Sequence, residues 1–314
     1  MNGKISVISG LTGRMTALFG LIVLLGCLAL GFAGTERAGA LLEEDARDAM
    51  LKEVRYLAAN QETRVNERLK VAQMTADRNA IRGRFGDRET TLAEKIEILQ
   101  RDLEQAKSLG IQRMGIIDKA GNAVYHNGTT ANQADREYFR RAMAGEANVS
   151  SSIISKLDNS VIFVFAAPVR HYATGEIIGV VTAVMDGTKF SQILGQVKFA
   201  QTGYAFAIDS SGKIIAHKEI DYVLKQENLL EKAKTDPELA QLAGAVEQMA
   251  KGEEGIAVYR YNNQDMLIAF SPIKSTGWSI ALTAPRGEVL SRVSGLKRDF
   301  IILSGLIILI AAAA

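Results

Sequence analysis

The chain has 314 residues, the length of about two domains, and its 23% charged and 47% hydrophobic residues exclude a disordered or low-complexity chain. It carries 37 lysines and arginines against 35 aspartates and glutamates, and the net charge of +2 arises from Lys4 and Arg14. Because the rest of the chain is balanced in charge, binding of nucleic acid through its phosphates is not expected. The single cysteine, Cys27, excludes an intramolecular disulfide and any zinc or redox site with several cysteines.

The first predicted element is a transmembrane helix at 15–35. These 21 residues carry no charge, and as a helix they extend about 30 Å, which matches the hydrocarbon core of a bilayer. Lys4 and Arg14 precede the segment, so a cytoplasmic tail is predicted at 1–14. The alternative is a cleaved signal peptide with its cleavage site at 38–40, although the apolar stretch is long for one.

A second uncharged segment occupies 300–314. It extends only about 22 Å as a helix, short of a full span, but apolar residues cover every face. We interpret it as the start of a second transmembrane helix, with a buried C-terminal core helix as the alternative. Residues 36–299 are then extracytoplasmic and held in the inner membrane at both ends, and the output domain lies beyond this sequence.

A long amphipathic helix is predicted from residue 36 to about residue 80, where the sequence contains no proline. Its apolar stripe follows steps of three and four residues and consists of Val54, Ala58, Val65, Leu69, Ala72 and Ala76. The stripe is thin and rich in alanine, and it packs either on its own domain or on a second copy of the chain. A second helix is predicted at 91–109, with Leu92, Ile96, Leu99 and Leu103 on one face.

After Gly110 the pattern changes to short β-branched runs, which are typical of strands. These runs are IQRMGIID, SVIFVFAAPV, EIIGVVTAVMD, GYAFAID, GKIIAH, EGIAVYRY, DMLIAFSPI and GWSIALTAP. Residues 116–126 resemble residues 207–217, with an aspartate, a glycine and a histidine each repeated after 91 residues. Aspartate and glycine at these positions favour a tight turn between paired strands. The sequence therefore predicts two copies of one α+β module with an antiparallel sheet.

The order of these elements resembles the double Cache sensor domain of bacterial transmembrane receptors, above all methyl-accepting chemotaxis proteins. The segments that carry the resemblance are ADREYFRRAMAGE, PVRHYATGEIIGVVTAVMDG, TGYAFAIDSSGKIIAH and IAFSPIKSTGWSIALTAP, and it covers about 36–299. It implies an α+β fold in which a long N-terminal helix precedes two PAS-like antiparallel-sheet modules, flanked by transmembrane helices. It also implies a homodimer that binds a small ligand in the membrane-distal module and signals for chemotaxis.

The resemblance divides the chain into seven parts. These are the cytoplasmic tail at 1–14, transmembrane helix 1 at 15–35, the stalk helix at 36–84, the membrane-distal module at 85–187, the membrane-proximal module at 188–285, a linker helix at 286–299 and the truncated transmembrane helix 2 at 300–314. The implied partners are a small-molecule ligand, the lipid bilayer, a second copy of the chain and a cytoplasmic chemotaxis kinase complex.

The family members that bind amino acids carry an Arg-x-Trp-Tyr segment, a Tyr-x-Asp segment and a later aspartate. Arg136 matches the arginine, a planar donor suited to a carboxylate, and Tyr138 and Phe139 replace the two aromatic residues. Asp186 matches the later aspartate, which in the family receives the ammonium group. Arg170-His171 stands where Tyr-x-Asp is expected, so a small carboxylate is as good a candidate ligand as an amino acid.

Each of these residues has a structural alternative. Asp135 is a good helix N-cap, so the same segment can simply begin a helix, with Arg136 in solvent and the aromatic residues in the core. Tyr125 and Phe163 are further candidates for lining the pocket, and a core position is the alternative for both. In the second module, Asp209 is predicted to be a turn residue and Trp278 a core residue.

No catalytic, metal-binding or cofactor motif stands out in the sequence. The three histidines lack metal-ligand spacing, and neither a GxSxG nor a phosphate-binding loop is present. We therefore predict a sensor without enzymatic activity, metal or cofactor. The alternatives are the sensor portion of a histidine kinase or diguanylate cyclase, a membrane-tethered structural or adhesion protein without a ligand, and a tethered enzyme.

Overall fold

The structure, a computed structural model, describes residues 4–291, 295, 298–299, 301–302 and 305, and between residues 4 and 35 it describes only some side chains. The chain forms two compact units, one made of 1–49 with 286–314 and the other of 50–285.

The smaller unit contains the N-terminal part of helix α1 (Lys4–Ala76) and helix α8 (Arg286–Val289). Arg286 Nη2 donates to Glu43 Oε1 at 2.8 Å, and Arg47 Nη2 donates to the same oxygen at 3.1 Å. Burial alone would raise the pKa of Glu43, but the two guanidinium groups outweigh it and lower the pKa. This shared ion pair joins α8 to α1.

Helix α1 includes the predicted span at 15–35. Large apolar side chains described in this part are between 56% and 70% exposed, namely Met15, Leu18, Phe19, Ile22, Leu25 and Phe32. Within the described part of the chain, no helix combines the length and hydropathy of a membrane span. The predicted second span at 300–314 lies largely outside the described residues, as do 292–294 and 296–297 of the predicted linker helix.

The part of α1 inside the larger unit packs its predicted stripe on the chain itself. The buried members are Val54, Ala58, Val65, Ala72 and Ala76, and Leu69 is half-buried. Arg68, only 8% exposed, donates through Nε to the backbone oxygen of Leu109 at 2.8 Å. The sequence left open whether this stripe packs on its own domain or on a second copy of the chain. In the structure it packs on its own domain.

The second predicted helix is α2 (Leu92–Ala106), followed by the short 3-10 helix η1 (Lys107–Leu109). Thr91 and Glu94 form a capping box, in which the Thr91 amide donates to Glu94 Oε2 at 2.9 Å and the Glu94 amide donates to Thr91 Oγ1 at 3.4 Å. The predicted face is buried at Leu99, but Leu92 is 52% exposed, because it lies in the first turn of the helix.

The first sheet module is antiparallel, with strand order β5-β4-β3-β9-β8-β6 and β7 paired to β8. Its strands are β3 (Ile111–Asp118), β4 (Asn122–Tyr125), β5 (Thr130–Asn132), β6 (Asn148–Val149), β7 (Ile153–Ile154), β8 (Val161–Arg170) and β9 (Ile177–Asp186). Helix α3 (Glu137–Met143) packs on β8 and β9. A separate two-stranded ribbon, β1 (Arg84–Phe85) with β2 (Arg88–Glu89), precedes the module.

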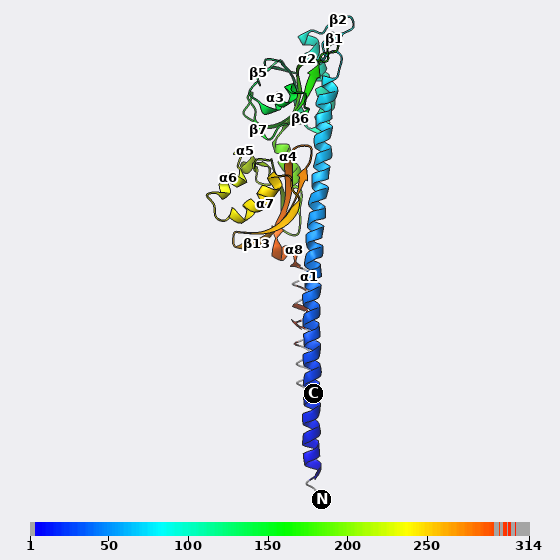
Figure 1. Ribbon diagram of the computed structural model, residues 1–314, viewed down its shortest axis with the longest axis vertical. Helices are drawn as coiled ribbons and strands as arrows, with labels where there is room; N and C mark the ends of the chain where they lie inside the picture. Colours follow the sequence, from blue (N-terminus) through cyan, green and yellow to red (C-terminus); the bar gives the residue numbers. More distant parts are fainter. Residues whose placement is uncertain (1–3, 292–294, 296–297, 300, 303–304, 306–314) are drawn as a thin grey trace. The chain divides into compact units, whose positions relative to one another are not determined.

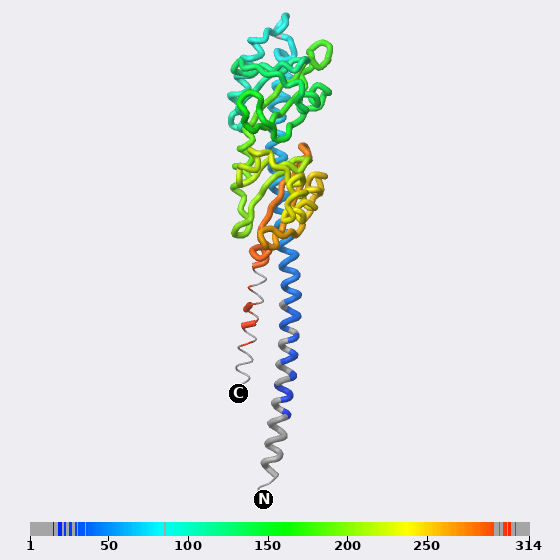
Figure 2. The backbone as a smooth tube through the Cα atoms, turned by 90° about the vertical axis from the view of Figure 1, so that its left-hand side faces the viewer, coloured from blue at the N-terminus to red at the C-terminus, as the bar shows by residue number. Residues whose placement is uncertain are grey.

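The second sheet module has the order β11-β10-β14-β13-β12, which is equivalent to β4-β3-β9-β8-β6 of the first. Its elements are α4 (Thr188–Gly195), β10 (Tyr204–Ile208), β11 (Ile214–Ala216), α5 (Asp221–Leu224), α6 (Leu229–Ala233), α7 (Ala240–Ala250), β12 (Gly255–Tyr261), β13 (Gln264–Ile273) and β14 (Trp278–Pro285). Both modules lie one after the other along the Met50–Ala76 part of α1 (Figures 1 and 2). The predicted long helix with two antiparallel sheets is confirmed.

The repeated aspartate and glycine form the same turn in both modules. Asp118 Oδ1 accepts from the amides of Ala120 and Asn122, and Asp209 Oδ1 accepts from those of Ser211 and Lys213. The glycine in each turn has a positive φ, +87° at Gly121 and +84° at Gly212, which a side chain disfavours. Asp209 is therefore a turn residue, as predicted.

An aromatic cluster joins the two modules. The ring of Phe163 on β8 lies 4.8 Å from that of Trp278 on β14, and Phe190 on α4 lies 5.7 Å from Trp278. All three are buried, so Trp278 is a core residue as predicted. The cluster fixes the first module onto the second through apolar burial.

Candidate functional site

A small cavity lies in the first module between its sheet, α3 and the β7 segment. Its lining residues are Arg113, Tyr125, Gln133, Arg136, Tyr138, Ile153, Ile154, Ser155, Lys156, Leu157, Ile162, Val164 and Val184. Its volume is about 10 Å³, which is room for about one water molecule. In this structure the site is therefore closed around its polar groups.

Arg136 is held at the start of α3, where it occupies the N-cap position with an extended backbone. Its Nη2 donates to the backbone oxygen of Ile154 at 2.7 Å, across the cavity. Its Nε is buried and has no hydrogen-bond partner among the described residues. An unpaired buried donor costs about 1–3 kcal/mol, so this nitrogen is available to an acceptor that enters the cavity. The N-cap is Arg136 and not Asp135, which pairs instead with Lys156.

A second guanidinium group reaches the cavity from β3. Arg113 is 9% exposed, and its Nη2 lies 3.5 Å from Ser155 Oγ and 3.7 Å from Asp158 Oδ2. Hydrogen bonds from Ser155 and Ser160 lower the pKa of Asp158 to about 2, so this carboxylate is ionised at neutral pH. Arg113 thus has one half-exposed counter-ion. Besides the two arginines, the cavity lining contains one more positive group, Lys156, which is paired with Asp135.

The sequence prediction missed Arg113. A signal was present, because Arg113 alternates with Gly115 and Ile117 along its strand, and Ile117 belongs to the core on the cavity side of the sheet. A cation at an inward position of a predicted strand is expensive unless it has a partner or a ligand.

Two tyrosines supply neutral donors beside the arginines. Gln133 Nε2 donates to the Tyr125 hydroxyl at 3.1 Å, and the Tyr125 ring lies 5.5 Å from the Arg113 guanidinium. Burial raises the pKa of Tyr125 and of Tyr138, so both phenols stay protonated at physiological pH. The arrangement is suited to an anionic group that accepts several hydrogen bonds.

The structure brings together three of the predicted residues, Arg136, Tyr138 and Tyr125. Phe139 is buried in the core between α3 and the sheet. Phe163 points to the opposite face of β8 from its neighbours Ile162 and Val164, which line the cavity. It therefore contacts Trp278 and not the cavity.

The other three predicted residues lie outside the cavity lining. Asp186, at the end of β9, accepts from the amide and the hydroxyl of Thr188, both at 2.8 Å. Arg170 is exposed and donates to the backbone oxygen of Gly175 at 3.3 Å. The His171 ring contacts the Tyr172 ring, with the centroids 4.7 Å apart and the planes tilted by 45°. Among the described residues, no group of three or more histidine, cysteine or acidic side chains is placed to hold a metal ion.

Comparison with known proteins agrees with this architecture. The Cache domain family model dCache_1 matches residues 38–293. Methyl-accepting chemotaxis protein McpA of Pseudomonas putida is 26% identical over 180 residues, which cover 56% of this chain and 25% of McpA. The chain thus spans about a quarter of the length of this curated relative.

Two solved structures share the fold. The ligand-binding domain of Pseudomonas fluorescens chemoreceptor CtaA, in complex with L-isoleucine, has a TM-score of 0.64 at 17% identity, covering 81% of this chain and 98% of that domain. The extracellular domain of histidine kinase mmHK1S-Z2 has a TM-score of 0.60 at 13% identity, covering 80% of this chain and 99% of that domain. The family model extends over most of the chain, from the stalk helix through both sheets, and the chain belongs to the Cache domain family.

Proposed function

We propose that this chain is the sensor region of a chemoreceptor and that its first module binds the carboxylate of a small ligand. The observation that carries the proposal is the buried, unpartnered Nε of Arg136, next to Arg113, in a cavity lined by two protonated tyrosines. A planar guanidinium donates two parallel hydrogen bonds to a carboxylate, so Arg136 supplies the anchor and Arg113 the second positive charge.

The ligand class is a small carboxylate, amino acids included. The chemoreceptor CtaA binds L-isoleucine according to its structure, which supports an amino acid. In this chain, however, Asp186 binds Thr188 and does not line the cavity, so no predicted ammonium acceptor stands there. The anionic end of the ligand therefore has the stronger support.

Binding requires the cavity to open. The β7 segment and the residues up to Leu157 form one wall, and Arg136 holds that wall through the backbone oxygen of Ile154. A carboxylate that enters competes for the Arg136 guanidinium. We infer that the ligand exchanges this internal contact for its own, and that the β7 segment moves as a result. A ligand shifts such an equilibrium by its differential affinity for the two states.

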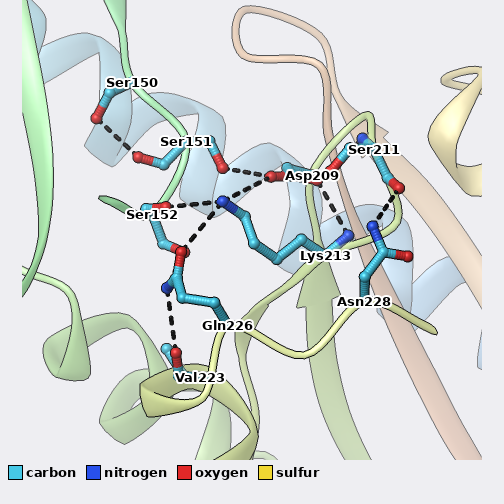
Figure 3. A network of polar contacts seen from close by, with 9 residues as sticks. All are labelled: Ser150, Ser151, Ser152, Asp209, Ser211, Lys213, Val223, Gln226 and Asn228. Atoms are coloured by element: carbon cyan, nitrogen blue, oxygen red, sulfur yellow. Dashed lines mark hydrogen bonds and ion pairs between the residues drawn. The ribbon is translucent and has the colours of Figure 1, made fainter. Parts of the chain in front are cut away.

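A polar network connects Ser151 and Ser152, the two residues directly before β7, to the second module (Figure 3). Ser151 Oγ donates to Asp209 Oδ2, and Lys213 Nζ donates to the Ser152 backbone oxygen at 2.9 Å and to Gln226 Oε1 at 3.2 Å. Gln226 Nε2 donates back to Ser152 Oγ at 3.0 Å. We propose that this network transmits movement of the first module to the turn of the β10–β11 hairpin and to the end of α5.

The proposed output is chemotaxis signalling across the inner membrane by a homodimer. In this proposal α1 crosses the bilayer at 15–35, residues 36–299 are extracytoplasmic, and a second crossing begins at 300. The exposed apolar side chains of α1 between Met15 and Phe32 support a lipid environment. The similarity to McpA supports a cytoplasmic chemotaxis kinase complex as the partner. The module at 85–187 is then membrane-distal and that at 188–285 membrane-proximal.

A second candidate function is the sensor of a histidine kinase. It is favoured by the fold shared with the extracellular domain of mmHK1S-Z2 over 80% of this chain. It uses the same ligand site and differs only in the domain that follows the second crossing. Sequencing the gene beyond the codon for residue 314 distinguishes the two.

The ligand site is tested by a thermal-shift screen of the full chain, purified in a mild detergent, against amino acids and small carboxylates. Free ligand at 100 times its dissociation constant stabilises the folded state by about 2.7 kcal/mol. We expect a hit that is lost in Arg136→Ala and kept in Arg170→Ala, a matched arginine outside the cavity. A hit that persists in a folded Arg136→Ala variant contradicts the proposed site.

A further inference from the structure

The second module contains a larger cavity, of about 490 Å³, which lies within the range of roughly 300–1,000 Å³ typical of small-molecule pockets. Its wall is rich in aromatic residues, namely Tyr204, Phe206, His217, Tyr222, Tyr259 and Tyr261. They come from β10, from the residue after β11, from α5 and from β12, so the sheet and the covering helices both contribute.

The rings are packed against one another around His217. The His217 ring lies 5.3 Å from Tyr204 and 4.7 Å from Tyr222, edge to face with both, and 6.2 Å from Phe206. Such contacts fix the orientation of the rings and present their faces in a defined direction.

Two ammonium groups of the chain already lie near these ring faces. Lys218 Nζ lies 3.9 Å from the centroid of the Tyr204 ring, and Lys232 Nζ lies 5.5 Å from that of Tyr222. Lys232 is also paired with Glu227 at 2.9 Å. A cation over an aromatic face within about 6 Å is attracted by the ring quadrupole, and such faces recognise organic ammonium ligands. The Tyr204 face is thus already occupied by a positive group of the chain itself.

The charge of the cavity agrees with a cationic ligand. Its lining contains two lysines and three carboxylates, namely Glu219, Glu227 and Asp236. The lining therefore has a net charge of −1 when His217 is neutral. His217 Nδ1 accepts from the Glu219 amide at 3.0 Å, which places the ring proton on Nε2. Burial lowers the pKa of His217, so the ring adds no positive charge at pH 7.

We propose that this cavity is a second binding site, specific for a small organic cation that bears an alkylated or primary ammonium group. The ligand displaces the Lys218 side chain from the Tyr204 face and completes the cage with Tyr222. Lys218 is exposed, so its ammonium group moves into solvent at little cost. The site is separate from the carboxylate site of the first module and shares no lining residue with it.

The test is isothermal titration of the full chain in detergent with tetramethylammonium chloride and with n-butylammonium chloride, against sodium chloride at equal ionic strength. We expect saturable binding that becomes tighter in Lys218→Ala, because the competing ammonium group is gone. Tyr204→Leu and Tyr222→Leu should each weaken binding by about 2- to 30-fold. If Tyr204→Leu does not fold, the half-buried Tyr222 carries the test.

Two variants serve as controls. Lys225→Ala removes a lysine of the same region that does not line the cavity, and Arg136→Ala removes the carboxylate site of the first module; both should leave the cation affinity unchanged. The proposal is overturned if neither cation binds the Lys218→Ala variant, or if both leucine variants bind as the wild type does. It is also overturned if Lys218→Ala abolishes binding of sodium acetate or benzoate to this cavity, since Lys218 then holds an anion.

Discussion

The first and second modules have equivalent strand orders and the same aspartate-glycine turn, yet their cavities differ in size and chemistry. The first is closed to about 10 Å³ around two arginines, while the second has about 490 Å³ and aromatic walls. The hydrogen-bonded ladder is set by backbone groups, which are the same in both. The chemistry of a cavity is set by the few side chains that face into it, so one fold carries two different cavities.

The largest expected effect on ligand affinity concerns the arginine pair of the first cavity, which the lining of the second cavity lacks. Arg113→Met keeps an unbranched, apolar stem and removes the guanidinium group with its charge. We expect the affinity for the carboxylate ligand to fall by about 30-fold or more. Removing one partner of a buried charge pair typically costs at least about 2 kcal/mol of binding free energy, which corresponds to that factor. Isothermal titration of the variant measures this, with Arg170→Met as the control. Unchanged affinity in Arg113→Met would show that Arg136 alone selects the ligand.

The repeated turns provide a stability comparison. A Cβ at Gly121 would lie 2.6 Å from Ala134 Cβ and 2.7 Å from its backbone, whereas at Gly212 it would meet the flexible side chain of Leu230 at 2.7 Å. We expect Gly121→Ala to lower the free energy of unfolding by about 3 kcal/mol and Gly212→Ala to lower it by about 2 kcal/mol. Both costs combine strain of the left-handed backbone with crowding around the added Cβ. Urea unfolding checks both.

Gly128→Ala serves as the control for these two substitutions, because Gly128 has φ +80° and nothing within 4 Å of the added Cβ. It should cost about 1 kcal/mol from backbone strain alone. Equal costs at Gly121 and Gly212 would mean that the crowding at both turns is relieved equally.

The network between the modules predicts energetic coupling between their sites. Saturation of the carboxylate site should change the affinity for tetramethylammonium by about fivefold, and the reverse effect must be equal. Lys213→Met removes the hydrogen bonds to Ser152 and Gln226, so it should reduce the coupling and cost about 1 kcal/mol of stability. The control is Lys225→Met. Coupling that survives Lys213→Met must travel through another contact, such as that between Phe163 and Trp278.

The smallest effect is a pH dependence at the repeated histidine. Burial lowers the pKa of His217, so protonation favours the unfolded chain. This part of the stability is complete above the unfolded pKa of about 6.5 and declines as the pH falls below it. His217→Gln should flatten the stability profile between pH 7 and 5. His126, half-buried and also lowered in pKa by burial, should give a weaker effect in His126→Gln.

Local patterns predicted most of the regular structure. The run IQRMGIID coincides with β3, and GWSIALTAP with β14, because alternation and β-branched residues are properties of neighbouring positions. The helix predicted from residue 91 begins with the capping box of Thr91 and Glu94, which is an equally local feature. The short strands β5 to β7 and helices α5 and α6 were not predicted, because they are too brief to show a period. Helix α7, with 11 residues, was not predicted either.

The site was predicted less well, for physical reasons. Arg136 and Tyr138 were found through their place in a family-like segment at the start of α3. Arg113 lies on β3, 23 positions before Arg136, outside that segment. The sequence shows that Phe163 and its neighbours alternate, but not which face meets the cavity. Contacts such as that between Gln226 and Ser152 join residues 74 positions apart, and no local pattern encodes them.

The closed first cavity bears on how sensitivity and selectivity evolve. When the open conformation is a minority, the apparent dissociation constant equals the intrinsic one divided by the open fraction, so an open fraction of about 1% raises it about a hundredfold. Substitutions in the β7 wall of the cavity, such as Ile154→Ala, therefore change the ligand concentration at which the proposed site fills. They do not alter the arginines proposed to bind the ligand. A bacterial lineage can adjust when it responds independently of what it responds to.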